Sequence, residues 1–420
     1  MTTSSRRLHL TLDDQVADRY LEVPFDVGDH QAVEVTLTYD REAAVVDLGC
    51  TDPERWRGWS GSSRERFAIT PTAATQGYEP GELPRGEWAV VLGLHNLPDE
   101  GIDVEVTITT SNRAGAVMVE NDPAPPPRPE NPRASSRDLP APEGLTWFAG
   151  DFHSHSLHSD GDLSLDELSE QAALHGLDFL AVTEHNTVSH HRHLPAVGER
   201  YDITLLPGQE VTTHRGHANA FGEIGWIDFR EPADRWVQEV AARGGLLSIN
   251  HPLEGDCSWQ HPLSELPPAL ELWHIGWFRD LKSEAPWALW PLWRRDAILL
   301  GGSDFHHHRH NYLPGTPTTW VAATDRSPTA ILEATVAGRT AITMLPGAGS
   351  PTLLRVGDEL IAVDADGSML VDIEGRSRTV HGDRQVFRAD SPADVGGVPG
   401  AGTAPYRLEA ADRTLFAICP

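Results

Sequence analysis

Apolar and polar residues alternate along the first quarter of the chain, as expected of strands with one buried face. Between Leu8 and Thr110 the alternation recurs in short runs such as Val33–Leu37 and Val104–Ile108, with turn residues between the runs. Successive side chains of a strand point to opposite faces, so each run presents one apolar face. The pattern predicts an antiparallel β-sandwich domain over residues 1–120.

The pattern changes after a proline-rich stretch. Residues 121–144 contain eight prolines and no apolar periodicity, which predicts an extended, semi-rigid linker. Beyond it, apolar runs of strand length alternate with helical segments expected at Ser164–His175 and from Pro232 to Gly244. The runs are Trp147–Phe152, Phe179–Thr183, Ile203–Pro207, Leu246–Ile249, Leu270–Ile275 and Ala297–Leu300. This alternation is typical of a parallel α/β domain, which we place at residues 145–345.

Short alternating strands return after about Pro346. Examples are Leu360–Val363 and Met369–Ile373, and a stretch rich in glycine and proline follows from Pro392 to Pro405. We expect a small β-rich C-terminal region over residues 346–420.

Charge and cysteine content narrow the range of partners. The chain has 33 Lys and Arg against 62 Asp and Glu, a formal net charge of −29 that repels a phosphate polymer, so we expect no nucleic acid partner. Cys50, Cys257 and Cys419 are too few and too far apart for a disulfide framework or a cysteine zinc site. Since there is also no apolar stretch of about 18 residues, we expect a cytoplasmic protein without a membrane partner. Nothing in the sequence sets the oligomeric state.

Histidines are concentrated in the central domain. Of 21 histidines, 17 lie between His153 and His310, and several follow the ends of predicted strands. His153 and His155 are two residues apart, so both imidazoles can face one metal ion, and Asp304 and His306 repeat that spacing. Because the carboxyl ends of parallel strands meet on one face of a barrel, these segments can meet in space.

Three further donors follow other strands of the domain. They are His185 after Phe179–Thr183, Glu210 after Ile203–Pro207, and His251 after Leu246–Ile249. A simple Ser-His-Asp triad leaves most of these groups without a role, whereas two or three metal ions need about this many ligands. Donors that are all nitrogen and oxygen suit zinc, manganese or iron.

The spaced motifs resemble the PHP superfamily, named for polymerase and histidinol phosphatase. The motifs are His153-Ser-His155-Ser-Leu-His-Ser-Asp160-Gly161, Thr183-Glu184-His185-Asn186, Glu210, His217-Ala-Asn219, Asn250-His251-Pro252 and Ser303-Asp304-Phe305-His306. Within that superfamily, the flanking β regions and the segment from Glu210 to His217 look most like the CehA/McbA branch, which includes a carbaryl hydrolase. The resemblance covers about residues 147–345 and implies a distorted (β/α)7 barrel.

The resemblance also implies how the ligands are shared among two or three divalent metal ions. It assigns His153, His155, Glu210 and Asp304 to one ion, and makes Glu210 the bridge to a second. His217 and His251 complete the second site, and Asp160, His185 and His306 hold a third.

The chain departs from the family pattern at Glu184, where relatives commonly place Asp. We interpret Glu184 as a residue that orients a ligand. His158 is an additional histidine within the first motif, which acts as a general acid or lines the pocket, and we favour lining. Amidohydrolases of the carboxylated-lysine type also begin with His-x-His, but they need a bridging lysine at a strand end. The single lysine, Lys282, is expected within a helix, so that class is disfavoured.

A pair of metal ions suggests hydrolysis by a metal-bridging hydroxide, with Asp304 as the acceptor of its proton. The ligands do not choose between phosphate esters and carbonyl substrates. Arg215, Arg192, Arg309 and His307 are candidate contacts to a phosphate, because arginine binds phosphate through two parallel hydrogen bonds. We therefore favour a phosphoesterase acting on a small phosphate mono- or diester.

Two alternatives remain open. Trp273, Trp277, Trp287, Trp290 and Trp293 favour an aromatic wall, which suits a carbamate, carboxylic ester or amide substrate, although such residues are more often core. A remoter alternative is a metal-binding interaction module without turnover, in which the sandwich recognises a partner through residues such as Trp56 and Trp59.

Overall fold

The computed structural model describes residues 1–113, 123–274, 276, 281–294, 296–389 and 405–420. By its internal contacts the chain divides into two units. The first unit comprises Met1–Ala124 together with two loops, His155–Ser164 and Glu184–Arg192. The second comprises Pro125–Ser154, Leu165–Thr183 and His193–Pro420.

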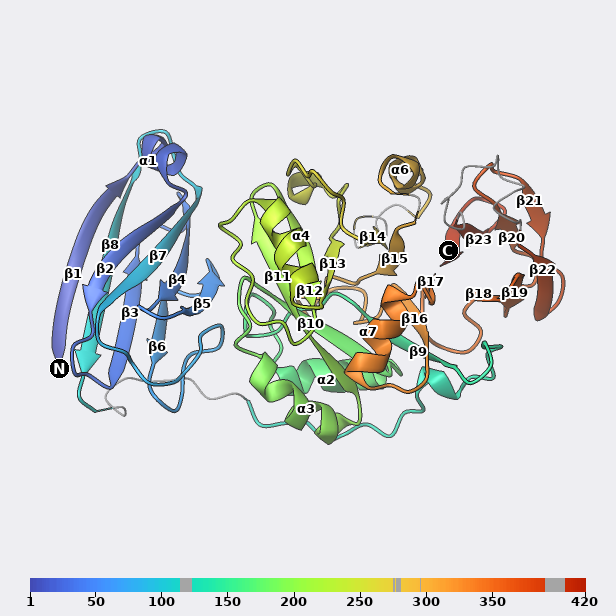
Figure 1. Cartoon of the computed structure of the whole chain (residues 1–420), viewed down its shortest axis with the longest axis horizontal. Helices are drawn as coiled ribbons and strands as arrows, with labels where there is room; N and C mark the ends of the chain where they lie inside the picture. The colour runs from blue at the N-terminus through green and yellow to red at the C-terminus, as the bar shows by residue number, and fades with distance from the viewer. Residues whose placement is uncertain (114–122, 275, 277–280, 295, 390–404) are drawn as a thin grey trace. The chain divides into compact units, whose positions relative to one another are not determined.

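The N-terminal part of the first unit is an antiparallel sandwich, which confirms the prediction from the alternating pattern. One sheet has the strand order β1-β8-β3-β6 and the other β2-β7-β4-β5, drawn in blue in Figure 1. The strands are β1 Thr2–Leu10, β2 Tyr20–Asp26, β3 Ala32–Thr38, β4 Val45–Thr51, β5 Trp56–Gly61, β6 Arg66–Ile69, β7 Glu87–Asn96 and β8 Ile102–Ser111. A short helix, α1 Leu12–Ala17, connects β1 to β2.

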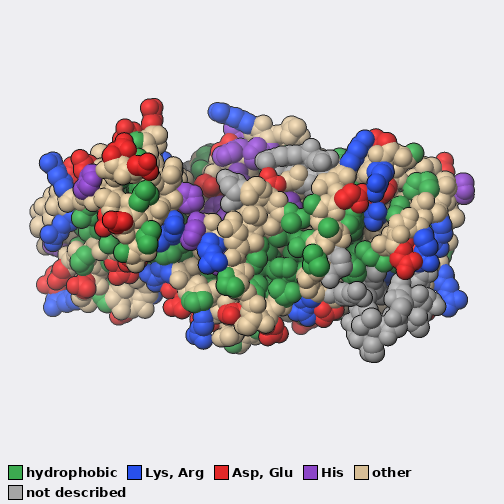
Figure 2. All heavy atoms as spheres, turned by 90° about the horizontal axis from the view of Figure 1, so that it is seen from above, with side chains coloured by type: hydrophobic (Ala, Val, Ile, Leu, Met, Phe, Trp, Pro, Cys, Tyr) green, Lys and Arg blue, Asp and Glu red, His purple; other side chains and the backbone are tan. Residues whose placement is uncertain are grey.

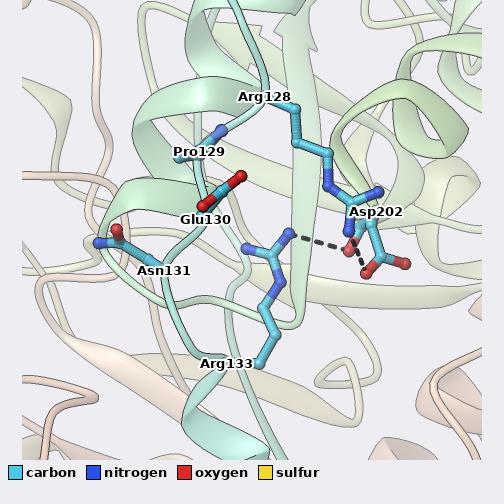
Figure 3. A pocket seen from close by; sticks show the side chains of 6 residues that line it. All are labelled: Arg128, Pro129, Glu130, Asn131, Arg133 and Asp202. Atoms are coloured by element: carbon cyan, nitrogen blue, oxygen red, sulfur yellow. Dashed lines mark hydrogen bonds and ion pairs between the residues drawn. The ribbon is translucent and has the colours of Figure 1, made fainter.

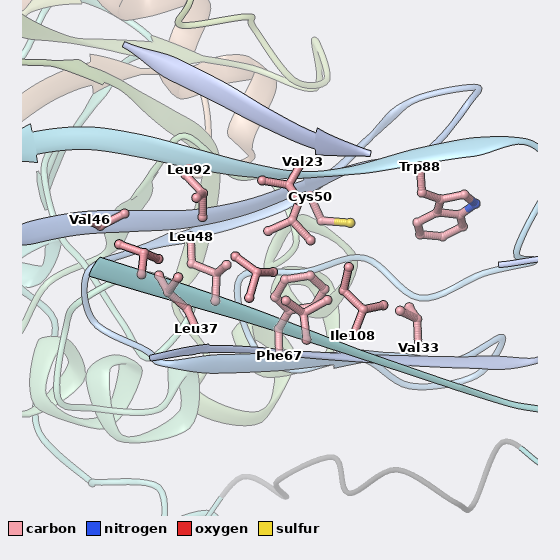
Figure 4. Packing of buried hydrophobic residues seen from close by; sticks show 14 of the residues in the cluster. Val23, Val33, Leu37, Val46, Leu48, Cys50, Phe67, Trp88, Leu92 and Ile108 are labelled. Atoms are coloured by element: carbon pink, nitrogen blue, oxygen red, sulfur yellow. The ribbon is translucent and has the colours of Figure 1, made fainter. Parts of the chain in front are cut away.

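The sandwich core lies between the two sheets. Val33 and Ile108 come from one sheet, Leu48 and Leu92 from the other, and all are buried (Figure 4). Burial alternates along β3 and the first part of β8, as the sequence pattern predicts, because every second side chain there points into this layer. Strand β7 differs, since its residues from Trp88 to Leu94 are all buried.

The second unit is built on a large mixed sheet. Its strand order is β15-β14-β13-β12-β11-β10-β9-β16-β17-β24-β23-β20-β21. The strands are β9 Thr146–Asp151, β10 Phe179–His185, β11 Thr204–Thr213, β12 Gly216–Phe221, β13 Leu246–Ile249, β14 Ala269–Trp273, β15 Ile298–Gly301, β16 Thr318–Ala323, β17 Thr340–Thr343, β20 Met369–Val371, β21 Ser377–Thr379, β23 Tyr406–Glu409 and β24 Leu415–Cys419. All six predicted runs of the central domain form strands within the described residues, and Ile275, the last residue of the fifth run, lies outside them.

The described helices of the second unit are α2 Leu165–Leu174, α3 Leu194–Tyr201, α4 Ala233–Ala242, α6 Ala285–Leu289 and α7 Pro328–Val336. Single 3₁₀ turns lie at Ala134–Ser136, His191–His193, Gly255–Cys257 and Trp290–Leu292. Of the helices, α3 packs on β11, α4 on β13 and α7 on β16. The two helices predicted from capping signals correspond to α2 and α4. None of the described helices combines the length and the apolar character needed to cross a bilayer.

The described strands form no closed barrel, so the predicted (β/α)7 closure is not confirmed. Two features interrupt a succession of parallel strands. First, β12 turns back antiparallel to both β11 and β13. Second, β16 runs antiparallel to β9, and β17 and β24 continue the sheet from there into the C-terminal residues. Strand periodicity does not report direction, and an antiparallel hairpin and a parallel crossover have similar apolar runs.

The C-terminal β-rich region has two parts. Strands β20, β21, β23 and β24 extend the large sheet, while β18 Thr352–Val356, β19 Glu359–Val363 and β22 Arg384–Arg388 form a sheet of their own. Most of the predicted stretch from Pro392 to Pro405, residues 392–404, lies outside the described residues.

Residues 125–144 differ from the expected unpacked linker. Ala134 is buried against Trp147 and Trp320, and Arg133 donates to the carbonyl oxygens of Ala173, Leu177, Tyr201 and Asp202. Figure 3 shows Arg128 and Arg133 pointing toward Asp202 in a pocket lined by this segment. Proline lacks an N–H donor and gives no periodicity, so these contacts depend on the residues between the prolines. The domain boundaries themselves stay predictions.

Leu48 tests the sandwich core. Leu48→Ala removes a side chain that is 0 % exposed and leaves a cavity, so we expect a loss of about 2–5 kcal/mol in the free energy of unfolding. Urea denaturation of the full chain, followed by circular dichroism, measures the change. Val16→Ala is the control because Val16 is 86 % exposed. Equal unfolding midpoints for both variants would show that the apolar layer between the two sheets is not the core of the sandwich.

Candidate metal centre

Five predicted ligands come together within the second unit. His153 follows β9, Glu210 lies in β11, His217 in β12, His251 follows β13, and Asp304 follows β15. They form two sets that share Glu210, and the donor atoms of each set lie within 4.8 Å of one another. The sets are His153, Glu210 and Asp304, and Glu210, His217 and His251.

Glu210 is the centre of both sets. Its carboxylate is 0 % exposed, and Oε1 lies 3.2 Å from His153 Nε2, 3.2 Å from His217 Nδ1 and 3.3 Å from His251 Nε2. Asn250 Nδ2 donates to the same oxygen at 2.8 Å. The hairpin of β11 and β12 explains part of this geometry. Its register pairs Glu210 with Asn219 and Thr212 with His217, so Glu210 and His217 lie two positions apart on adjacent strands.

His153 contacts three carboxylates. Its Nε2 lies 3.1 Å from Asp304 Oδ1 as well as near Glu210, and its Nδ1 donates to Glu271 Oε1 at 3.0 Å. A carboxylate that accepts the proton of one ring nitrogen fixes the tautomer and leaves the other nitrogen to act as a ligand. Glu271 therefore orients His153 toward the two carboxylates of its set.

Glu271 contacts two of the predicted ligands and was missed by the sequence analysis. It lies in β14 within the apolar run Leu270–Ile275, and its Oε2 also accepts the backbone N–H of His251 at 2.7 Å. Gly302 permits this packing, because a Cβ there would lie 2.0 Å from Glu271 Oε1 and 2.6 Å from His153 Cβ. The sequence offered one signal for Glu271, which is an acidic residue in the middle of an otherwise apolar strand.

Asp151 joins two of the ligand segments and was also missed. Its buried carboxylate accepts the backbone N–H of His153 at 3.0 Å and that of Ser303 at 3.0 Å, and it binds Ser303 Oγ at 2.5 Å and Gly315 N at 2.6 Å. Burial raises the pKa of Asp151 to about 6, while these donors oppose that rise. The contacts fix the starts of the loops that carry His153 and Asp304.

Two of the predicted ligands have backbone angles that L-residues seldom adopt. The φ of His251 is 25° and that of Asp304 is 50°. Such conformations cost about 1–3 kcal/mol each and persist where the surroundings impose them, most often at functional sites. Both residues are therefore held in place by contacts rather than by local preference.

The electrostatics of this cluster favour a cation. Burial alone lowers the pKa of His153, but Asp304, Glu210 and Glu271 outweigh burial and raise that pKa well above 6.5. At His251 burial again opposes the charged form, and the hydrogen bond to Glu210 raises the pKa. The three carboxylates thus stabilise positive charge at this cluster, whether it is carried by a protonated imidazole or by a bound cation.

The donor chemistry fits divalent metal ions. All donors are imidazole nitrogens or carboxylate oxygens, as zinc, manganese and iron prefer. His251 Nδ1 is buried and has no hydrogen-bond partner among the described residues. Buried polar atoms are usually paired, so an atom of this kind is consistent with a ligand position.

The first unit holds a third set of donors, His155, Asp160 and His185. Their ligand atoms lie within 4.8 Å of one another, with 3.5 Å between His185 Nε2 and Asp160 Oδ1. The rings of His155 and His185 stack with centroids 4.4 Å apart. Asp160 is the most accessible of these ligands, with a side chain that is 45 % exposed.

Glu184 lies behind this third set. Its buried carboxylate accepts hydrogen bonds from Ser156 Oγ and Ser159 Oγ, both at 2.5 Å, and burial raises its pKa to about 7. Ser159 Oγ is in turn 3.4 Å from His155 Nδ1. This chain of contacts is consistent with the prediction that Glu184 orients a ligand.

The remaining predicted residues differ in their surroundings. His158, in the first unit, is 6 % exposed with Nδ1 2.8 Å from Ser189 Oγ. His306, in the second, has Nδ1 2.9 Å from the carbonyl oxygen of Asp304. His307 and Arg309 are exposed in the loop after β15, and Figure 2 shows histidine side chains reaching the surface. The catalytic and substrate-binding roles stay predictions.

The two other predicted arginines are also exposed. Arg215 lies in the turn between β11 and β12, where its guanidinium donates to the carbonyl oxygen of Gln260 at 2.7 Å. Arg192 ends the second loop of the first unit. Lys282 lies in a turn before α6 and not in the expected helix. Its ammonium group forms an exposed ion pair with Asp412 at 2.7 Å.

No protein-family model matches the sequence, and a search of curated proteins finds no match. Solved structures of PHP-like metal-dependent phosphoesterases are among those similar to this chain. One is a two-domain protein from Bacteroides vulgatus that contains a predicted PHP-like metal-dependent phosphoesterase. It is 18% identical, covers 70% of this chain and 99% of its own, and gives a TM-score of 0.40.

Two further structures match over shorter regions. A protein from Bifidobacterium adolescentis thought to be a metal-dependent phosphoesterase is 17% identical, covers 39% of this chain and 90% of its own, and has a TM-score of 0.30. An amidohydrolase from Chromobacterium violaceum with bound sulfate and no metal is 16% identical, covers 47% and 98%, and has a TM-score of 0.29. Scores below 0.5 assign neither a branch nor an activity to this chain.

Glu271 provides a test of the metal centre that leaves every proposed ligand in place. Glu271→Gln removes the negative charge and replaces one of the two acceptor oxygens by an NH2 donor. The side chain can then accept from His153 Nδ1–H or from His251 N–H but not from both, so we expect cation affinity to fall about 10–100-fold. Calorimetric titration of the metal-free protein with Mn²⁺ measures the affinity. Glu333→Gln, at an exposed position of α7, is the matched control. Unchanged affinity in Glu271→Gln would contradict the orienting role.

Proposed function

We propose that this chain is a PHP-type metal-dependent hydrolase that acts on a small phosphate mono- or diester. The observation that carries the proposal is the position of Glu210, a buried carboxylate whose Oε1 lies within 3.3 Å of three imidazole nitrogens. A carboxylate shared by two donor sets is what a pair of neighbouring cations requires. The PHP-like order of the motifs independently assigns Glu210 the bridging role.

The motif resemblance completes the ligand sets. It adds His155, two residues after His153, to the His153–Glu210–Asp304 set, and His306 to the His155–Asp160–His185 set. The chain then offers ligands for two or three divalent ions, with zinc, manganese and iron as candidates. When bound, such ions polarise a phosphoryl or carbonyl oxygen and lower the pKa of water.

The residues of the chain have separate tasks in this proposal. Glu271 holds the Nδ1 proton of His153 and so keeps Nε2 directed toward Glu210 and Asp304. Asp304, with a side chain that is 18 % exposed, accepts the proton released by the attacking water. Its left-handed backbone fixes the carboxylate beside His153 before substrate arrives. His158, held by Ser189, lines the pocket.

The phosphate preference is supported by accessible arginines. Arg215, Arg192 and Arg309 are exposed and can meet a phosphate that enters from solvent. By contrast, Trp273 is 0 % and Trp290 4 % exposed, so neither forms an open aromatic wall. Trp287 and Trp293 are half-buried, and Trp277 lies outside the described residues. The carbamate or carboxylic ester alternative thereby loses part of the feature that favoured it.

Hydrolysis of two nitrophenyl probes tests the proposal. We expect turnover of nitrophenyl phosphate that requires added Mn²⁺ or Zn²⁺ and exceeds turnover of nitrophenyl acetate. His217→Ala removes one donor beside Glu210 and should lower that turnover about 100-fold or more, since residues that only orient ligands are worth about 10–100-fold.

His381→Ala is the control, because His381 is exposed in the C-terminal region. Faster turnover of the acetate probe would replace the phosphoesterase by the carbonyl-substrate alternative. Bound metal without turnover of either probe would favour a metal-binding module.

A further inference from the structure

The first unit joins the N-terminal sandwich to two loops that carry three of the proposed ligands. The sandwich residues end by Ala124, while the loops are His155–Ser164 and Glu184–Arg192. The loops contain His155, Asp160 and His185. Contacts between the sandwich and these loops are therefore contacts of one compact unit, formed across 93–130 residues of sequence.

The loop with Asp160 is held through its backbone. Ser159, the residue before Asp160, has a carbonyl oxygen that accepts from Ser63 Oγ at 2.9 Å and from Arg64 Nη1 at 3.0 Å. The second nitrogen of the Arg64 guanidinium donates to the carbonyl oxygen of Leu157. One sandwich arginine thus binds two carbonyl groups of the segment that leads into the ligand.

The loop with His185 is held in the same way. Trp56 Nε1 donates to the carbonyl oxygen of Asn186, the residue after His185, at 3.2 Å. Asn186 is buried with a φ of 55°, a conformation that needs outside support. Thr187 Oγ1 donates to the carbonyl oxygen of Gly77 at 2.7 Å. The residues adjacent to both Asp160 and His185 are thus bound by sandwich side chains.

Gly77 shows how close this approach is. Its φ is +94°, and a Cβ there would lie 2.9 Å from the carbonyl oxygen of His158 and 2.7 Å from that of Trp59. Any larger residue would push the sandwich away from the loop. The contact requires a glycine at this turn for steric reasons as well as for its backbone angle.

Two buried carboxyl groups belong to this unit. Asp47 lies in β4, and burial raises its pKa to about 7. Within the loops, Glu184 connects the two segments through Ser156 and Ser159.

We propose that the sandwich is a positioning domain for the His155–Asp160–His185 set, and that Arg64 and Trp56 are positioning residues that hold Asp160 and His185 for cation binding. The inference rests on the proposed function, because it takes this set to be a cation site. It assigns the N-terminal domain a role in assembling the metal centre. A carbohydrate or protein ligand is not needed to explain the burial of Trp56 and Trp59, because Trp56 bonds to the Asn186 carbonyl oxygen and stacks on Trp59.

Cation binding by the full chain tests this role directly. Arg64→Ala should bind one ion fewer by elemental analysis, or lose about 10–100-fold in affinity for the weakest-bound Mn²⁺ in calorimetric titration. Trp56→Phe keeps an aromatic ring but removes the N–H donor together with the pyrrole part of the indole, and a smaller loss of about 3–10-fold is expected because a single neutral hydrogen bond is lost. Arg64→Lys retains a donor for the Ser159 carbonyl and should restore part of the affinity.

Matched controls make the same chemical changes elsewhere in the sandwich. Arg7→Ala breaks an exposed ion pair with Glu105, and Trp88→Phe removes an indole donor to the Pro84 carbonyl. If Arg64→Ala and Trp56→Phe bind as many ions as tightly as these controls, the positioning role is wrong. If Arg64→Ala does not fold, Trp56→Phe and Ser63→Ala decide the question.

His185→Ala separates the two levels of the proposal. If it loses an ion while Arg64→Ala and Trp56→Phe do not, the cation set stands and only the role of the sandwich fails. If His185→Ala keeps every ion at full affinity, this set is not a cation site, and the positioning role is overturned with it. Hydrolysis at the sets sharing Glu210 is then judged separately by the nitrophenyl phosphate assay with His217→Ala.

Discussion

The Glu210 carboxylate, fully buried among three imidazoles, is the interaction on which the central unit depends. A buried carboxylate is costly unless opposite charge and hydrogen bonds compensate it. Here Asn250 donates one hydrogen bond, and His153, His217 and His251 approach the same oxygen. Glu210 lies in β11 and His217 in β12, while His153 follows β9 and His251 follows β13. The order of these strands in the sheet therefore brings all three imidazoles to this one carboxylate.

Two buried acidic residues, Asp151 and Glu271, hold the residues around Glu210 in position. Asp151 fixes the backbone that leads into His153 and Asp304, and Glu271 fixes the ring of His153 and the backbone of His251. Neither is a proposed ligand, but together they set the orientation of three ligands. Preorganisation of this kind reduces the entropy lost when a cation or substrate binds.

Much of the site could be predicted from the sequence because its ligands follow strands in a specific order of motifs. The sequence motifs predicted one metal-binding cluster that includes His153, Glu210, His217, His251 and Asp304. These residues lie close together in the second unit. Glu271 and Asp151 were missed because a single acid at a strand carries no spacing signal. Their roles depend on which strands are neighbours, which a one-dimensional pattern does not contain.

The fold, like the site, could be predicted only in part from the sequence. Alternation predicted the sandwich, and apolar runs predicted β9, β10, β11, β13, β14 and β15. The direction of β12 and β16 and the continuation of the sheet through β24 could not be predicted, since strand direction leaves no trace in residue periodicity. The packing of residues 125–144 was missed for a related reason, because Arg133 binds carbonyl groups and needs no apolar pattern.

The discontinuous make-up of the first unit has a consequence for biosynthesis. The last sandwich strand, β8, ends at Ser111, whereas the loops that complete the unit begin at His155 and end at Arg192. During translation the sandwich strands leave the ribosome first, and domains generally fold in that order. The sandwich can thus present the Trp56 and Arg64 donors before the loop carbonyl groups that they bind have been synthesised. Assembly of this unit is complete only when nearly half of the chain has been made.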